Sequence, residues 1–566
     1  MFNINYLKQV GKFWFIPLVL IVFSSCTDVD ETINSQVTPD QFFQNEQQFT
    51  SALGDAYAIL GTGGGSAPGF GGHNGFTSMY EISADQVLIP HKGPDWFDGG
   101  QWLRMHQHEF KYDEASINGT WLFMFSGINS SNRLIAQFER LIEDGSVDEE
   151  LATGFIAELE VLRSFYYLKL LDAFGNVPIL TSFEGVEDPA NNSNFQAGRT
   201  EVFEFVEKSI TDNLDKLSTD VGSTVGRMNK FVAHMMLARL YMNAEVYIEE
   251  PKWQEALDQL NAVEDGGYSL ADNYSANFVT NNSGSPEIIF AVPYDNVNLT
   301  GFNLHQMTLH YQQQAKFQMQ SQPWNGYSTL SEFYNSHIDP EQNLGPEGDV
   351  IGLDGLPTEG VLDDRLANFS VGLQEDNSGN VITDASFATT NDASDVQRGT
   401  VDESPKLRLT PKLDELEPNA NRQAGARITK YEIEPGALPD LNNDFVIYRY
   451  ADVLLLKAEA LMRLNSENDP MALQYVNQIR ERAGVTPFTN LTFDKLLAER
   501  GREMFYEVTR RSDLIRFDGK EGATRFNDTW TFKDEVSGDY RNVFPIPQDQ
   551  LEANSNLFQN PEYTGR

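Results

Sequence analysis

The stretch Tyr448-Arg-Tyr-Ala-Asp-Val-Leu-Leu-Leu-Lys-Ala-Glu-Ala-Leu-Met-Arg-Leu464 has the pattern of a buried amphipathic helix. Val453, Leu456 and Ala460 recur on one face with Leu464, and no glycine or proline interrupts them. The neighbouring rows are apolar as well, so this face is wide enough to contact several other helices. The pattern therefore predicts a helix over 448–464 that is buried between others.

A second helix is predicted directly after the first. Asp469-Pro470 is typical of a helix start, and Ala483-Gly484 is typical of a helix end. Two antiparallel helices of this length, rich in small residues, resemble one tetratricopeptide-type unit. The apolar stripe of the second helix consists of Ala472, Leu473, Val476 and Ile479.

The first half of the chain repeats this helical character. We count about four helix pairs, three before residue 265 and one after 447, with 496–517 packed beside the last. A lone pair cannot bury its own apolar face, so the pairs must stack. The further predicted helices cover a segment up to about residue 60 and then 121–142, 149–174, 202–217, 231–247 and 253–263.

Residues 266–446 have a different composition, dominated by Gly, Asn, Asp, Pro and aromatic residues. A segment of this length is too long for a loop in a compact domain. It is therefore interpreted as an irregular lobe packed on the helices. We expect one helix over 306–320 and short strands at 287–292 and 445–448.

Four ordered blocks in the last part of the chain resemble one protein family. The first is Arg449-Tyr-Ala-Asp-Val-Leu-Leu-Leu-Lys-Ala-Glu-Ala460, and together the blocks are similar to the signature of SusD/RagB-like proteins. These are surface nutrient-binding lipoproteins of Bacteroidota. The other blocks are Asn477-Gln-Ile-Arg-Glu-Arg-Ala-Gly484, then Glu499-Arg-Gly-Arg-Glu-Met-Phe-Tyr-Glu507 with Arg511-Ser-Asp-Leu-Ile-Arg-Phe517, and then Phe544-Pro-Ile-Pro547 with Asn556-Leu-Phe-Gln-Asn-Pro-Glu-Tyr563.

The resemblance implies a mainly α, SusD-like fold, with helix pairs as scaffold and a loop-rich lobe beside them. It also implies a partner, a SusC-like TonB-dependent transporter of the outer membrane that receives the captured oligosaccharide. Charged residues within the signature blocks are interpreted as scaffold, because charges among apolar rows must be paired or they cost several kcal/mol each. These residues are Arg449, Asp452, Glu459, Arg480, Arg482, Glu499, Arg500, Glu503 and Arg516.

Composition limits the class of partner. The 566 residues include 41 Lys and Arg against 83 Asp and Glu, a formal charge of −42. Nucleic acids and anionic lipid surfaces are bound through cationic patches, so neither is expected as a partner. The 40% hydrophobic and 12% aromatic content is sufficient for a large core.

The N-terminus has the features of a lipoprotein signal peptide over residues 1–25. Lys8 and Lys12 precede an apolar stretch, 13–23, that is too short to span a bilayer. Cys26, the single cysteine, follows Ser24-Ser25 and is predicted to be lipidated; a chance cysteine is the alternative. We expect residues 26–37 to form a flexible tether, and the resemblance implies a single SusD-like domain over 38–566.

The tether also carries information about location. Its acidic segment Thr27-Asp-Val-Asp-Glu31 resembles the tag that sends such lipoproteins to the outer face of the outer membrane. An ordinary polar tether is the alternative. We therefore expect the protein on the extracellular face of the outer membrane, anchored at Cys26.

No catalytic constellation is evident in the sequence. Carboxylates are so frequent that the presence of any two carries little weight. His106 and His108 lack a third metal ligand at a suitable spacing, and a Gly-x-Ser-x-Gly motif is absent. The sequence predicts a protein that is not an enzyme and needs neither a metal nor a cofactor.

Carbohydrate binding is favoured instead. An indole that covers ~50 Å² of a sugar ring contributes roughly 1 kcal/mol, while neighbouring Asp or Asn side chains bind the hydroxyl groups. Two loops, 91–102 and 322–327, hold aromatic residues beside turn residues and acids or amides. For each candidate the alternative is a packing role. The predicted ligand-binding residues are Trp96, Trp324, Tyr327, Trp102, Asp95, Asp98, Asn325, Phe70 and His73.

The predicted function is a cell-surface lipoprotein that captures an oligosaccharide or polysaccharide, for example a β-glucan such as laminarin. Two alternatives stay open. One is a surface lipoprotein that binds peptides or another non-glycan nutrient. The other is an extracellular glycoside hydrolase.

Overall fold

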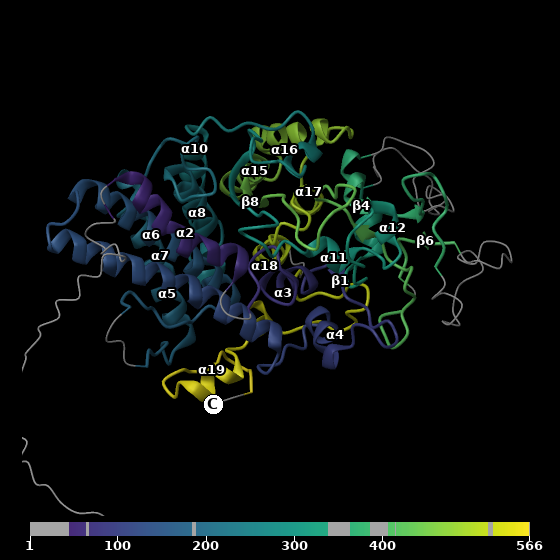
Figure 1. The fold of residues 1–566 in the computed structure, drawn as a ribbon, viewed down its shortest axis with the longest axis horizontal. Coiled ribbons are helices and arrows are strands. Elements are labelled where there is room, and N and C mark those ends of the chain that lie inside the picture. Colours follow the sequence, from purple (N-terminus) through teal and green to yellow (C-terminus); the bar gives the residue numbers. More distant parts are fainter. Residues whose placement is uncertain are drawn as a thin grey trace, which may run out of the picture.

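The computed structural model describes residues 43, 45–63, 67–183, 188–337, 363–384, 406–413, 415–518 and 525–564. Helices dominate the regular structure, and the strands in these residues are only two to five residues long (Figure 1). This confirms the predicted mainly α fold. No described helix combines the length and the apolar character that crossing a bilayer requires.

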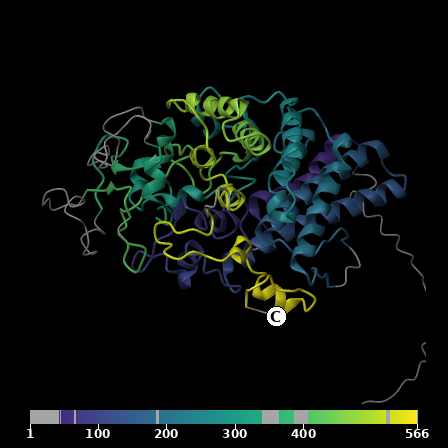
Figure 2. The same cartoon turned by 180° about the vertical axis from the view of Figure 1, so that it is seen from behind.

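One group of helices fills one half of the molecule and is seen from both sides in Figures 1 and 2. Within it, α5 packs on α6, α6 on α7, and α8 on α10, as expected for stacked helical hairpins. Its members are α2 (Glu46–Thr62), α5 (Ala115–Glu143), α6 (Glu149–Phe174), α7 (Phe195–Thr211), α8 (Lys230–Met242), α9 (Ala244–Ile248) and α10 (Trp253–Glu264).

The C-terminal pair, α15 (Tyr450–Leu464) and α16 (Pro470–Arg482), extends this group, because α10 packs on α15. The helices α17 (Phe493–Glu503) and α18 (Arg510–Phe517) lie beside the pair. The predicted helix over 496–517 is therefore two helices, separated at 504–509 by Tyr506 and Val508, whose φ angles are positive. The short helix α19 (Gln548–Ala553) lies close to the C-terminus (Figure 1).

The helix predicted over 448–464 begins two residues later than expected. Tyr448 and Arg449 belong instead to strand β8 (Phe445–Arg449), which pairs antiparallel with β2 (Ile288–Val292). Aromatic and β-branched residues favour this extended conformation. The backbone N–H of Tyr450 then donates to the carbonyl of Glu287 (2.8 Å), so the strand pair leads directly into α15.

The irregular lobe carries short elements joined by loops. The single helix predicted over 306–320 is two helices, because His310 to Gln312 form a turn between them. The helices of this lobe and its neighbourhood are α3 (Phe76–Ile82), α4 (Gln101–His106), α11 (Leu304–Thr308), α12 (Gln313–Phe317) and α13 (Ser331–Asn335). The strands are β1 (Val87–Leu88), β3 (Ser328–Thr329), β4 (Phe369–Ser370), β5 (Gly372–Leu373), β6 (Arg408–Leu409) and β7 (Arg427–Ile428), paired as β1–β3, β4–β7 and β5–β6.

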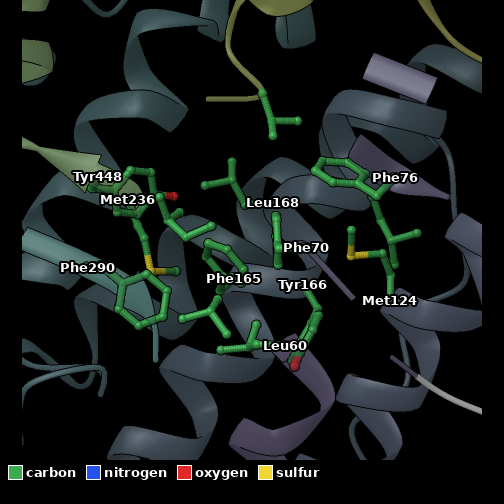
Figure 3. Packing of buried hydrophobic residues seen from close by; sticks show 14 of the residues in the cluster. Leu60, Phe70, Phe76, Met124, Phe165, Tyr166, Leu168, Met236, Phe290 and Tyr448 are labelled. Carbon is green, nitrogen blue, oxygen red and sulfur yellow. The ribbon is translucent and has the colours of Figure 1, made fainter. Parts of the chain in front are cut away.

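Aromatic side chains form the core where the helices meet the loop segments (Figure 3). Phe70 lies at its centre, with ring centroids 5.3 Å from Phe76, 5.8 Å from Phe165 and 6.1 Å from Phe445. Its side chain is 1% exposed. Phe70 was predicted to contact ligand, and the structure replaces that role with packing, because the Gly-rich segment around it folds back onto the core.

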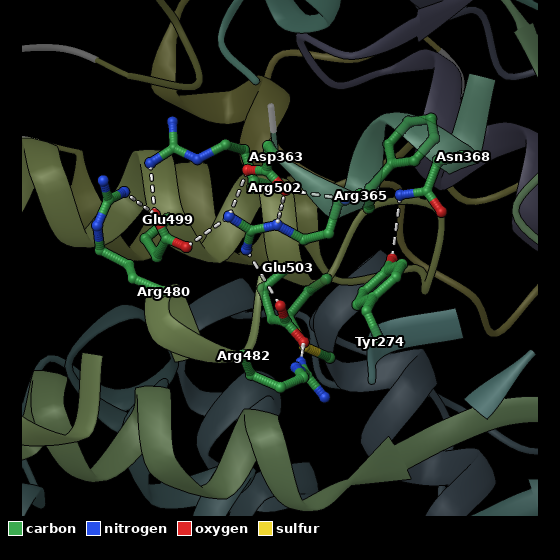
Figure 4. A network of polar contacts seen from close by, with 12 residues as sticks. Tyr274, Asp363, Arg365, Asn368, Arg480, Arg482, Glu499, Arg502 and Glu503 are labelled. Carbon is green, nitrogen blue, oxygen red and sulfur yellow. Dashed lines mark hydrogen bonds and ion pairs between the residues drawn. The ribbon is translucent and has the colours of Figure 1, made fainter. Parts of the chain in front are cut away.

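A buried ion-pair network joins the irregular lobe to the C-terminal helices (Figure 4). Arg365, from the lobe, bonds Glu499 (2.8 Å) and Glu503 (3.1 Å) on α17. Arg449 bonds Glu503 (2.6 Å) from the other side and Glu287 (2.7 Å) from the lobe. Burial by itself raises the pKa of Glu503, but the surrounding guanidinium groups outweigh this effect and hold the pKa at about 2. These charges are thus paired and structural, as the sequence predicts.

Replacing Arg449 with Met is expected to reduce the free energy of unfolding by about 3–5 kcal/mol, because Glu503 and Glu287 are left buried without this partner. Arg133→Ala is the matched control, since its partner Asp55 is 71% exposed, and it should cost less than about 1 kcal/mol. Urea unfolding followed by circular dichroism measures both. Equal effects of the two changes would contradict a structural role for the network.

Candidate functional site

The loop that follows β1 has an unusual backbone. Four of the five residues 96–100 have positive φ angles: Trp96 (66°), Asp98 (42°), Gly99 (65°) and Gly100 (80°). Glycine adopts this conformation freely, whereas Trp and Asp are destabilised in it. Non-glycine residues in strained backbone cluster at functional sites. The loop is therefore a candidate site from its backbone alone.

Two tryptophans from distant segments meet beside this loop. The Nε1–H of Trp96 donates to the backbone carbonyl of Trp324 (2.8 Å), and both side chains are half-buried. The ring of His73 lies 4.6 Å from that of Trp324. Phe97, which is 49% exposed, lies 4.9 Å from the ring of His91. We call these five residues, Trp96, Phe97, Trp324, His73 and His91, the aromatic shelf.

Two buried cations hold the backbone that follows Trp324. The ammonium group of Lys92 donates to the carbonyls of Asn325 (2.7 Å) and Gly326 (2.8 Å). The guanidinium of Arg427 donates through Nε to Oδ1 of Asn325 (3.0 Å). Burial lowers the pKa of Arg427 to about 9 and that of Lys92 well below its usual value. Backbone carbonyls and an amide, rather than carboxylates, accept these bonds, so the cations fix the shelf.

Carboxylates lie beside the shelf. Oδ2 of Asp95 accepts hydrogen bonds from the hydroxyl of Tyr311 (2.6 Å) and from Nη2 of Arg422 (3.0 Å). Asp98 is exposed and accepts a hydrogen bond from the indole of Trp102 (2.7 Å). Both carboxylates keep free acceptor positions in this arrangement, since each carboxylate can accept several hydrogen bonds.

The imidazole of His73 contributes to the shelf as a neutral ring. Burial lowers its pKa, and only partial compensation comes from its hydrogen bond with Asn303 (3.1 Å) and from the charge of Asp98. A neutral ring against Trp324 presents apolar surface together with one polar edge. That combination suits a ligand that has both C–H faces and hydroxyl groups.

Three further predicted ligand contacts lie in the interior and take packing or positioning roles instead. The side chain of Trp102 is 1% exposed, and those of Tyr327 and Asn325 are fully buried. Trp102 orients Asp98, Tyr327 bonds the hydroxyl of Ser78, and Asn325 bridges Arg427 and a backbone carbonyl. Turn residues beside an aromatic ring do not specify which way the ring points, so the sequence could not separate these residues from Trp96 and Trp324.

Several residues of the site are not among the predicted ligand contacts. Phe97 had a local signal, since it follows Trp96 in the same Gly-flanked loop. Tyr311 and Arg422 had none, because they reach Asp95 across 216 and 327 positions of the chain. Only tertiary structure brings these residues together.

His106 and His108 bond backbone carbonyl groups. Nε2 of His106 lies 2.9 Å from the carbonyl of Thr531, and Nε2 of His108 lies 2.9 Å from that of Ser83. Burial lowers the pKa of both side chains. In the described parts of the chain, no three His, Cys, Asp or Glu side chains are placed to hold a metal ion.

Comparison with known proteins identifies the family. The model of the SusD family matches residues 286–563. Residues 286–563 thus belong to the SusD/RagB-like family. The family consists of carbohydrate-binding, non-catalytic proteins, and this confirms the prediction that the chain is not an enzyme.

Relatives cover the SusD-like chain along its whole length. The starch-binding protein SusD of Bacteroides thetaiotaomicron is 23% identical over 99% of both chains. A SusD superfamily protein from Parabacteroides distasonis superposes with a TM-score of 0.68 at 19% identity, over 92% of this chain and 99% of the other. Surface glycan-binding protein A from Bacteroides thetaiotaomicron, solved with laminarihexaose, superposes with a TM-score of 0.65 at 19% identity. The superposition covers 91% of this chain and 99% of the other. These two structures establish the shared fold.

Changes at Asn325 test the rigidity of the shelf of this SusD-like protein. Asn325→Ala removes two hydrogen bonds and leaves a Cβ at a φ of 57°, so we expect a loss of about 2–4 kcal/mol in the free energy of unfolding. Asn325→Gly removes the same bonds but relieves the backbone, and it should be about 1 kcal/mol more stable than the Ala variant. Chemical denaturation provides the comparison; an Ala variant as stable as the Gly variant would contradict it.

Proposed function

We propose that this protein binds a neutral oligosaccharide or polysaccharide on the aromatic shelf. The observation that carries the proposal is the direct contact between two half-exposed tryptophans, Trp96 and Trp324, with Asp95 and Asp98 beside them. An indole face packs on the C–H face of a sugar ring, and the carboxylates accept hydrogen bonds from its hydroxyl groups. The shelf is fixed before ligand arrives, which lowers the entropic cost of binding.

Electrostatics favours an uncharged glycan. The chain carries a formal charge of −42, and this charge repels a polyanion over distances up to about the Debye length. At the shelf, the guanidinium of Arg422 is already paired with Asp95. A sulfated or uronic-acid chain would therefore find repulsion and no unpaired guanidinium at this position.

The relatives support a glucan in particular. Starch, the ligand named for one relative, is an uncharged polymer of glucose, and laminarihexaose, bound in a solved neighbour, is an uncharged oligomer of glucose. We propose a β-glucan such as laminarin as the ligand. Flat glucose rings without axial hydroxyl groups present the C–H faces that two indoles can cover.

The proposal extends to location and partner. The signal peptide (1–25), the lipidated Cys26 and the tether (26–37) lie outside the described residues and stay predictions, as does the single domain over 38–566. We propose that the lipoprotein is held at the extracellular face of the outer membrane. There it delivers glycan to a SusC-like TonB-dependent transporter, and enclosure against the transporter raises the local concentration of a weakly held ligand.

Single substitutions of the two tryptophans test the glycan proposal. Trp96→Ala and Trp324→Ala should each weaken laminarin binding about five- to thirtyfold, since each removes roughly 1–2 kcal/mol of stacking. The double variant should bind more weakly than either single variant. Trp253→Ala is the matched control, because Trp253 is also half-buried but lies on α10 against Arg463. Isothermal titration calorimetry with laminarin, starch and an alginate measures the affinity of each variant.

The outcomes separate this function from its rivals. Unchanged glycan affinity in the double variant would reject the shelf. Binding of a peptide digest without any glycan binding would favour the nutrient-binding alternative. Release of reducing ends from a bound polysaccharide would favour the hydrolase and reject the proposal of passive capture.

A further inference from the structure

A cavity lies at the other end of the ribbon that carries the shelf. Strands β1 and β3 are antiparallel, with Val87 opposite Thr329 and Leu88 opposite Ser328. The chain therefore leaves one end of the ribbon toward Trp96 and Trp324. It leaves the opposite end toward Asp85 on one strand and Leu330 on the other, and these two residues line a cavity of about 360 Å³.

An indole forms part of the wall of this cavity. Trp530 and Lys533 close a tight hairpin, with reciprocal backbone hydrogen bonds of 3.1 and 2.8 Å. Phe532, at a φ of 65°, makes the turn. The ammonium group of Lys533 lies over the Trp530 ring at 4.7 Å and is fixed by backbone carbonyls, including that of Glu535 (2.9 Å). The indole is thus supported on one face and is half-buried at the cavity.

The other residues that line the cavity include two apolar side chains and two carboxylates. Leu330 and Phe333 are buried and supply apolar surface. Arg510 holds Asp85 through two hydrogen bonds of 2.6 and 2.7 Å, and the Asp85 side chain is 26% exposed. Glu332 is exposed and accepts from the hydroxyl of Thr531 (2.5 Å). One planar ring beside two oriented carboxylates matches a ligand with a C–H face and hydroxyl groups at its edge.

We propose that this cavity is a second carbohydrate-binding site, which takes one or two sugar residues on Trp530. The ligand class rests on the function proposed for the shelf, whereas the site itself rests on the separate geometry of the cavity. Its volume suits a short segment of a glycan. Trp530 also has a buried Nε1–H without an acceptor among the described residues.

Two sites at the two ends of one short ribbon have a functional consequence. A polysaccharide repeats the same unit, so one chain, or two branches of one chain, can engage both sites. The second contact is then intramolecular and increases the apparent affinity without a stronger single site. An oligosaccharide too short to reach both sites would gain nothing from the second one.

Fluorine NMR of protein that contains 5-fluorotryptophan tests the second site directly. The comparison uses the unmodified sequence and the Trp96→Ala/Trp324→Ala double variant, each titrated with β-1,3-linked and α-1,4-linked glucose tetrasaccharides. We expect the Trp530 resonance, assigned by its loss in Trp530→Phe, to shift saturably in both proteins. The resonance of Trp253, which lies on α10 outside this cavity, should stay unchanged.

Trp530→Ala, added to the double variant, should lower the remaining affinity about tenfold or more. Trp530→Phe keeps a planar ring and should lower the affinity less. This variant tests whether the loss in the Ala variant comes from the missing ring or from impaired folding. A Trp530 resonance that never moves while those of Trp96 and Trp324 do would overturn the second site and leave the shelf intact. A shift at Trp530 alone would reject the shelf instead, and no shift anywhere would reject both.

Discussion

The pairing of buried charges between α17 and its neighbours is the constraint on which the rest of the structure depends. Glu503 accepts from Arg449, at the junction of β8 and α15, and from Arg365, in the irregular lobe. A buried charge without partners is costly, so none of these segments can move away independently. The network therefore fixes the loop-rich lobe against the helices. The segments that carry the aromatic shelf are held in place together with the lobe.

The shelf shows a second use of buried charge. Lys92 and Arg427 donate to the backbone and side chain at 325–326 and so act as clamps. Near the core of the scaffold, arginine side chains pair with carboxylates. At the shelf, Lys92 and Arg427 instead donate hydrogen bonds to neutral carbonyl groups. In both places the buried charged groups Glu503, Lys92 and Arg427 have hydrogen-bond partners, and the side chains that remain exposed are rings and carboxylates suited to a glycan.

Sequence patterns predicted the scaffold well, because helices of this kind are encoded locally. The helix predicted over 149–174 coincides with α6, and the pair after residue 447 was in error only where β8 takes Tyr448 and Arg449. The site was harder to predict. Trp96 lies in the loop and Trp102 in the first turn of α4, and the four residues with positive φ between 96 and 100 separate a half-buried ring from a fully buried one. Nothing local distinguishes the two rings, and Tyr311 and Arg422 join Asp95 only through tertiary contacts.

The single hydrogen bond from the Trp96 indole to the Trp324 carbonyl joins segments 228 positions apart. Each tryptophan lies in a loop outside the helical hairpins, so either loop can diverge without loss of the ion pairs that hold the scaffold. A change in one loop nevertheless alters the angle at which both rings meet a ligand. Substitutions in one short segment can in this way change the geometry of both rings, while the frame stays the same.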